Sequence, residues 1–123
     1  SGSPFEASFG YSRAVVDGDM VYVSGTTGYD YAKMDMPDDA GAQAVNALST
    51  IAGALADAGA SMQDVVRVKY YLSDGSFEES VGAAVGAVFK DIRPAATMII
   101  CGLIRPEMKI EIEVTARIGA HAS

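Results

Sequence analysis

The chain has 123 residues, of which 50% are hydrophobic and 20% charged, and its formal net charge is −7. This composition is that of one folded domain and excludes a disordered chain, and no apolar run reaches the ~18 residues that a membrane-spanning helix needs. The nine basic residues are scattered, which argues against nucleic acid as the main ligand, because phosphate binding uses clustered Lys and Arg.

The chain has one cysteine, Cys101, and one histidine, His121. A single cysteine forms no intrachain disulfide and is typical of a reducing cytoplasm. No signal peptide is visible, so we expect a cytoplasmic protein. A metal site with two or more His or Cys ligands cannot be built within one chain, and the carboxylates follow no Mg²⁺ or Ca²⁺ motif. We treat residues 1–123 as one domain, in which residues 1–3 resemble a cloning remnant.

The first half of the chain predicts a hairpin and a helix. Residues 4–13 look irregular, and strands over 14–16 and 20–24 flank an Asp-Gly turn, which is a hairpin signal. A loop follows over 29–37, where Tyr29 and Tyr31 are candidates for lining a pocket. Asp38 or Asp39 caps a helix that runs to about Ala58, and Gly59 is placed to end it in the left-handed conformation.

The second half predicts a strand, a helix and two more strands. Residues 65–72 read as a strand and 77–90 as a helix, which Gly82 and Gly86 weaken by roughly 1 kcal/mol each relative to Ala. Residues 96–101 are apolar almost throughout, so we expect a strand buried on both faces, with Cys101 an inert apolar residue in it. Residues 109–117 alternate strictly between apolar and polar, which is a clear strand signal.

The order is therefore ββ-α-β-α-ββ, and two amphipathic helices cannot cover both faces of such a sheet. We expect them on one face, in an α+β two-layer domain. The opposite face then carries the charged positions of two strands, among them Arg67, Lys69, Glu111 and Glu113. Mixed charge on an open sheet face suggests self-association, with charges pairing across subunits.

An ordered set of short segments resembles the RidA family, also called YjgF or L-PSP. The segments cover residues ~10–117 with only short gaps and include 18–25 (GDMVYVSG), Gln43, 58–61 (AGAS), 64–68 (DVVRV), 71–74 (YLSD), Phe77, 93–95 (RPA) and 109–113 (KIEIE).

The resemblance implies a chorismate-mutase-like (RidA-like) two-layer α+β domain with a mixed sheet and two helices on one face. It also implies a homotrimer with a small-molecule cleft between neighbouring subunits. The best-known members hydrolyse enamines and imines such as 2-aminoacrylate to 2-oxo acids and ammonia, without a cofactor. In them the arginine of a Pro-Ala-Arg motif binds the substrate carboxylate through the two-pronged geometry of guanidinium.

Carried over residue by residue, the family's tyrosine falls on Tyr11 and its catalytic glutamate on Glu111, which together would position water and substrate. The arginine position falls on Ala96, which cannot bind a carboxylate. Loss of such a desolvated contact removes roughly 2–5 kcal/mol. The sequence thus resembles an arginine-lacking branch, and standard deamination of 2-imino acids is not expected.

Other residues are assigned to substrate binding. Backbone donors near Gly25 and Thr97 would stabilise developing charge, and Thr97 and Met98 flank the cleft in the family. Arg93 is a candidate to replace the missing anchor, with Arg13 and Arg105 as alternatives.

Each of these residues also has an ordinary structural interpretation. Glu111 can be a solvated strand residue, Tyr11 a packing residue, each arginine a surface residue, and Met98 part of the core.

Three functions remain open. The first is hydrolysis of an enamine, imine or related C–N substrate, one that lacks an α-carboxylate or is held by another group. The second is a small-ligand-binding or regulatory homotrimer without turnover. RNA cleavage is the weakest, given the charge of −7 and the single histidine. We expect no membrane partner.

Overall fold

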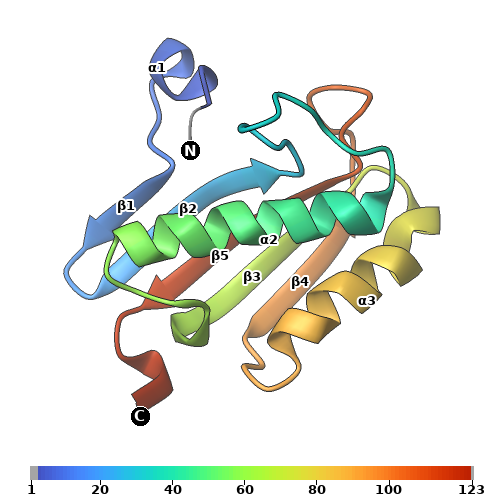
Figure 1. Ribbon diagram of the computed structural model, residues 1–123. Helices are drawn as coiled ribbons and strands as arrows, with labels where there is room; N and C mark the ends of the chain where they lie inside the picture. The colour runs from blue at the N-terminus through green and yellow to red at the C-terminus, as the bar shows by residue number, and fades with distance from the viewer. Residues whose placement is uncertain (1–2, 123) are drawn as a thin grey trace.

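One sheet of five strands, in the order β1-β2-β5-β3-β4, organises the computed structural model, which describes residues 3–122 (Figure 1). The strands are β1 (Ala14–Asp17), β2 (Met20–Thr27), β3 (Val65–Leu72), β4 (Ala95–Ile100) and β5 (Ile110–Arg117). The helices are α1 (Phe5–Phe9), α2 (Ala40–Asp57) and α3 (Glu78–Phe89), with 3₁₀ turns η1 (Met62–Asp64), η2 (Gly75–Phe77) and η3 (Ala120–Ala122). The predicted ββ-α-β-α-ββ order is confirmed.

Both long helices lie on one face of the sheet, as predicted (Figure 1). The alternation of β5 explains this, because Ile110, Ile112, Val114 and Ala116 are each at most 2% exposed and form the core with α2 and α3. The charged residues between them are half-buried on the opposite, open face. This open face holds the predicted catalytic carboxylate.

The sheet is mixed. Strands β3 and β4 are parallel, because helix α3 connects them as a crossover. The pairs β1–β2, β2–β5 and β3–β5 are antiparallel.

Helix α2 begins and ends as its sequence predicts. The Asp39 carboxylate accepts a hydrogen bond of 2.8 Å from the Ala42 backbone, and Gly59 adopts a φ of 83°. The buried Gln43 then fixes the helix to two loops. Its amide donates to the carbonyls of Pro37 (2.8 Å) and Glu107 (3.0 Å) and accepts from the Lys109 backbone (2.9 Å).

Two predictions about exposed segments are wrong. Residues 4–13 are not wholly irregular, because Phe5–Phe9 form a short helix in which the two Phe rings stack 5.4 Å apart. Five residues are too few for helical periodicity to be visible in the sequence.

Strand β4 is not buried on both faces: all six of its residues are exposed, and Ile100 is 65% exposed. It is an edge strand that pairs only with β3.

The C-terminal turn is fixed to the body of the domain. His121 contacts the carboxylate of Asp64, 2% exposed, at 2.5 Å, and Asp64 also accepts hydrogen bonds from the backbones of Gly119 and Ser61. Within residues 3–122, no helix is long and apolar enough to cross a membrane.

Candidate functional site

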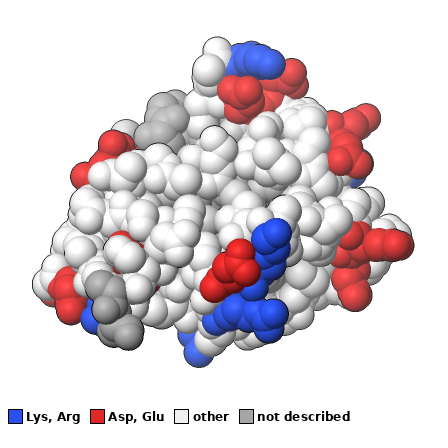
Figure 2. Space-filling model, turned by 60° about the horizontal axis from the view of Figure 1, so that its bottom comes forward, with Lys and Arg blue, Asp and Glu red and all other residues white. Residues whose placement is uncertain are grey.

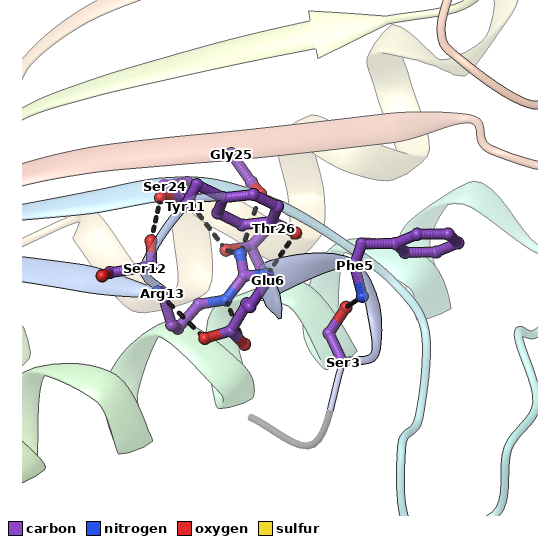
Figure 3. Close-up of polar contacts among 9 residues, drawn as sticks. All are labelled: Ser3, Phe5, Glu6, Tyr11, Ser12, Arg13, Ser24, Gly25 and Thr26. Carbon is purple, nitrogen blue, oxygen red and sulfur yellow. Dashed lines mark hydrogen bonds and ion pairs between the residues drawn. The ribbon is translucent and has the colours of Figure 1, made fainter. Parts of the chain in front are cut away.

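Arg13 lies at the centre of a polar network between the α1 segment and strand β2 (Figure 3). Its side chain is only 8% exposed. Its Nη1 donates to the Gly25 carbonyl (2.9 Å) and to the Thr26 hydroxyl (3.0 Å), and its Nη2 donates to the Tyr11 hydroxyl (3.2 Å). The Glu6 carboxylate is 3.7 Å from Nε. A buried guanidinium held at this many points is a fixed positive charge.

Gly25 makes room for the carboxylate of Glu111. A Cβ atom at position 25 would lie 2.0 Å from Glu111 Oε2, so the carboxylate occupies the space where another residue would have a side chain. Position 25 falls where the β2–β5 register shifts between Val23 and Thr26, and such a bulge redirects the local backbone. Gly25 and Glu111 therefore form one unit.

The pKa of Glu111 is raised, first by burial and then by the nearby charge of Glu113, while Arg13 acts in the opposite direction. Burial and a like charge both disfavour the ionised carboxylate. A carboxyl group whose pKa is raised holds a proton more readily than an ordinary one, which suits it to exchange a proton with a substrate or water.

A second carboxylate on the open face is held by a phenol. The Tyr71 hydroxyl donates a short hydrogen bond to Glu113, and this bond, with burial, raises the pKa of Tyr71 to about 12. Tyr71 is also the cross-strand neighbour of Glu111. The Glu113 carboxylate is thus held in place by Tyr71 beside Glu111.

The predicted site residues fall into two groups in one chain. Tyr11, Gly25 and Glu111 are brought together around Arg13. Thr97 and Met98 lie on β4, which is separated from β5 by β3. At a strand spacing of about 4.8 Å, β4 lies about 10 Å from β5.

Along β4, neighbouring positions point to opposite faces. Thr97 is in register with Lys69 on the open face, whereas Ala96 and Met98 are in register with Val68 and Tyr70 and face the helices. Arg93 precedes this strand and lies with Ala96 at a separate cavity.

Among the described residues 3–122, two cavities on the helix side of the sheet concern the predicted site residues. The larger, of about 730 Å³, is lined by residues of α1, the start of β1, the 29–32 loop and α2, including Arg13, Tyr29 and Tyr31. The rings of these two tyrosines lie 5.0 Å apart. The smaller, of about 270 Å³, lies between α3, β3 and β4 and includes Ala96 and Arg93.

Cys101 is not buried as predicted: it follows the exposed edge strand and is half-buried. The single histidine, His121, contacts Asp64. Among residues 3–122, no three His, Cys, Asp or Glu side chains are grouped so that they could hold a metal ion.

Sequence reasoning missed most of the network around the site. The sequence predicts Arg13 only as an alternative anchor, because a lone arginine before a strand is usually a surface residue. It gives no signal for Glu6, which lies in an apparently irregular segment. The sequence does place Tyr71 and Glu113 at polar positions of two predicted strands. It does not give the register between these strands, so it cannot show that the two side chains meet.

Comparison with known proteins places this arrangement in a family. The family model described as Endoribonuclease L-PSP matches residues 2–118. A Streptomyces coelicolor protein is 35% identical over 121 residues, covering 98% of this chain and 90% of that protein.

Solved structures are similar throughout. A member of the YjgF/YER057c/UK114 family from Mycobacterium tuberculosis is 43% identical and superposes with a TM-score of 0.87 over 96% of this chain and 95% of that one. RidA from a Psychrobacter species is 30% identical with a TM-score of 0.82, over 88% of each chain. The YjgF gene product of E. coli is 26% identical with a TM-score of 0.81, over 87% of each chain. Membership supports a small-molecule deaminase-like or binding role, and the chain belongs to the RidA/YjgF/L-PSP family.

Proposed function

We propose that this chain is a RidA-type hydrolase that converts a small enamine or imine to a carbonyl compound and ammonia. The observation that carries the proposal is the half-buried Glu111 carboxylate, which occupies the space beside Gly25, has a raised pKa and lies within electrostatic range of Arg13. An ordinary surface glutamate extends into solvent, so it does not require a neighbouring residue without a side chain.

In the proposed reaction, Glu111 takes a proton from a water molecule as the water oxygen attacks the imine carbon. The C–N double bond becomes single, and its electron pair takes a proton from the Tyr11 hydroxyl. Glu111 then gives its proton to the amine of the resulting carbinolamine. The carbinolamine hydroxyl returns a proton to the Tyr11 oxygen as the C=O group forms, and the C–N bond breaks to release ammonia. A carboxyl group that exchanges a proton in both directions needs a pKa near the working pH, which agrees with the raised pKa of Glu111.

Tyr11 has a supporting role in this proposal. Its hydroxyl accepts a hydrogen bond from Arg13, so its own hydrogen is free to be donated to the substrate nitrogen or to the attacking water. Arg13 orients Tyr11 and limits the rise in the Glu111 pKa. Its Nη donors already bond Gly25, Thr26 and Tyr11, so we do not assign it as the carboxylate anchor.

The working form is proposed to be a homotrimer, with each site completed by a neighbour. Support comes from the edge strand β4, where Ile99 and Ile100 are 45% and 65% exposed, and from Ile104, which is 83% exposed. Exposed apolar surface of this kind is typical of subunit contacts. A neighbour would supply Thr97, which lies on the open face of β4, to the Tyr11–Glu111 group, which one chain leaves apart. Light scattering should then give three times 12.8 kDa, and a monomer at micromolar concentration would refute this.

The reaction is tested with chemically generated imines. Wild-type protein should accelerate ammonia release from at least one member of a panel with and without an α-carboxylate, and Glu111→Gln should lose at least 100-fold. Glu107→Gln is the matched control, because Glu107 is an exposed loop residue. Unchanged rates in Glu111→Gln would refute the assignment.

Ligand binding without turnover is the alternative, and the alanine at position 96 favours it, because the family's anchor is missing there. RNA cleavage is not proposed, since the chain carries a net charge of −7. Ala96→Arg distinguishes the first two. If this variant hydrolyses 2-aminoacrylate, the Glu111 site is competent, and if it binds 2-oxo acids without turnover, the alternative is preferred.

A further inference from the structure

The larger cavity has room for a small molecule. Its volume is about 730 Å³, within the range of roughly 300–1,000 Å³ that is usual for ligand sites. Its lining on α2 runs from Asn46 to Ala58, which is roughly 18 Å at 1.5 Å per residue. Figure 1 shows α1 and the loop before α2 on the same side of this helix. The cavity is therefore an elongated groove along α2.

A ligand in this groove would not reach Glu111. Ala14 and Val16 line the groove from β1. Their cross-strand partners, Val23 and Val21, belong to the core beneath the helices. The groove is thus on the helix side of the sheet, whereas Glu111 lies on the open face. An occupant is a separate ligand, distinct from the substrate of the proposed reaction.

Carboxylates outnumber cations in the groove. Among the described residues, Glu6, Asp30 and Asp57 line it against Arg13 alone. Asp57 is the last residue of α2, where the helix dipole is negative. Its side chain makes no hydrogen bond or ion pair within residues 3–122, and the last turn of α2 contains no basic residue. The groove therefore favours a positively charged occupant.

Acidic side chains alone would not identify a site on this chain. They lie at several places on the face seen in Figure 2, in keeping with a net charge of −7. Two half-buried tyrosines distinguish the groove: the rings of Tyr29 and Tyr31 lie 5.0 Å apart at an angle of 58°. The face of a tyrosine ring attracts an ammonium group. With Asp30 between them in the chain, the two rings provide a site for a cation.

The loop that carries the tyrosines is held in shape by its own hydrogen bonds. The backbones of Asp30 and Asp35 bond each other in both directions, at 2.6 and 3.2 Å. The Asp30 carboxylate accepts from the backbones of Ala32 (3.0 Å) and Lys33 (3.2 Å). A ligand would therefore bind a preformed loop, which lowers the entropic cost of binding.

A buried donor beside the groove has no acceptor. Arg13 is 8% exposed, and its Nε has no hydrogen-bond partner within residues 3–122. The Glu6 carboxylate, which also lines the groove, lies 3.7 Å from Nε (Figure 3), beyond the ~3.2 Å reach of an N–H···O bond. Buried donors are usually paired. An uncharged oxygen of an occupant would satisfy Nε, because a carboxylate there would face Glu6.

We propose that this groove binds a linear aliphatic amine that also carries an uncharged oxygen, as an amino alcohol does. The ammonium lies between Tyr29, Tyr31 and Asp30, and the oxygen accepts from Nε of Arg13. Alkylamines titrate near the ~10.4 of lysine, so the ligand is cationic at pH 7. The proposal goes beyond the hydrolase and does not depend on it.

The test compares four six-carbon probes by amide chemical shifts at pH 7: 6-amino-1-hexanol, hexylamine, 1,6-hexanediol and 6-aminohexanoate. The amino alcohol should shift the amides of Tyr31, Thr50 and Gly53, on both walls of the groove. The diol lacks the charge and should bind on the order of 10-fold more weakly. Hexylamine lacks the oxygen and should bind about 5-fold more weakly.

Each probe can overturn one part of the proposal. Equal binding of the diol would refute the cation site, and equal binding of hexylamine would refute the acceptor at Arg13. Tighter binding of 6-aminohexanoate than of the amino alcohol would show an anion site instead. Absence of amino alcohol binding at millimolar concentration, or shifts confined to β4, would overturn the whole.

Substitutions separate this site from the general negative charge. Asp30→Asn keeps the amide oxygen that accepts from Ala32 and Lys33 but removes the charge, so it should weaken the amino alcohol on the order of 10-fold without unfolding the loop. Asp91→Asn is the matched control, because Asp91 is exposed and does not line the groove. Equal weakening by the two would refute a specific site.

A second pair of variants tests the aromatic contact. Tyr31→Phe keeps the ring and should retain binding of the amino alcohol, whereas Tyr31→Leu should weaken it about 5-fold. Equal binding by the two variants would refute the contact between the ammonium and the ring. Melting temperatures of both variants establish that each is folded.

The outcomes also distinguish this site from the hydrolase. Glu111→Gln should leave amino alcohol binding unchanged, because the sheet separates the two places. Amino alcohol binding that depends on Asp30, without turnover of any imine, would refute the hydrolase and keep the groove. Imine turnover without amino alcohol binding would keep the hydrolase and refute the groove.

Discussion

Replacing Gly25 by alanine tests the central feature of the proposed site. The added Cβ would lie 2.0 Å from Oε2 of Glu111, 3.0 Å from its Cδ and 3.4 Å from its Cγ. Oε2 must therefore move by at least 1 Å to reach 3.0 Å, a separation below which Cβ contacts are essentially never found. Gly25 has no positive φ, so alanine fits the backbone itself. The whole perturbation falls on the carboxylate.

The expected costs to activity and stability differ. Misplacement of a reacting group by about 1 Å costs on the order of 100-fold in rate. Overpacking costs about 1–3 kcal/mol of unfolding free energy. We expect a cost near the lower value, because the displaced atom, Oε2 of Glu111, is at the end of a flexible side chain. We therefore expect a folded variant with at least 100-fold lower hydrolysis.

An assay that needs no substrate follows the Glu111 carboxyl carbon by NMR through a pH titration. In the wild type the pKa should be raised, because burial and Glu113 disfavour ionisation. In Gly25→Ala the carboxylate is pushed outward, and its pKa should fall toward the ordinary value. An unchanged pKa and an unchanged rate together would refute the reasoning.

Two other glycines are matched controls. At Gly28 a Cβ would lie 2.4 Å from the Gln43 Cα, and because backbone cannot rotate away, Gly28→Ala should destabilise by roughly 3 kcal/mol or more. At Gly53 nothing lies within 4 Å, so an alanine in this helix should stabilise by about 0.5–1 kcal/mol. Urea denaturation measures all three variants, and an order other than Gly53, Gly25, Gly28 would contradict the geometry.

Three further outcomes are expected. The folded state raises the pKa of Glu111, so ionisation of this carboxyl group destabilises the fold only at pH values above the group's usual pKa. Glu111→Gln should therefore stabilise the fold at pH 7 and leave its stability unchanged at pH 4. Urea titrations that show a loss of stability at pH 7 would contradict this. Burial opposes the ionisation of Asp64, but hydrogen bonds led by that from His121 lower its pKa. His121→Ala should therefore cost about 1 kcal/mol at pH 7. This difference should shrink as the pH falls through the lowered pKa, and a constant difference would count against the contact. Tyr71→Phe removes a hydrogen bond to a charged group and should cost about 1.5–3 kcal/mol, with chemical denaturation at pH 7 as the measurement.

The sequence alone determined the order of the elements and the inner and outer faces of β5. Local chemistry decides these features: strict alternation in residues 109–117, the Asp39 cap of α2 and the left-handed Gly59 are properties of a few neighbouring residues. The ordered motifs also identified the family, which the comparisons show independently.

Only the tertiary structure decided which residues meet. The sheet order places β5 between β2 and β3, so Gly25 and Glu111, 86 positions apart, share one space. It also places β4 at the edge, so a run of apolar residues that reads as buried is exposed in one chain. Burial depends on the neighbours of a strand, and strand order is not encoded in any local pattern. For the same reason the smaller cavity, which brings Ala96 and Arg93 together, depends on the packing of α3 beside β3 and β4.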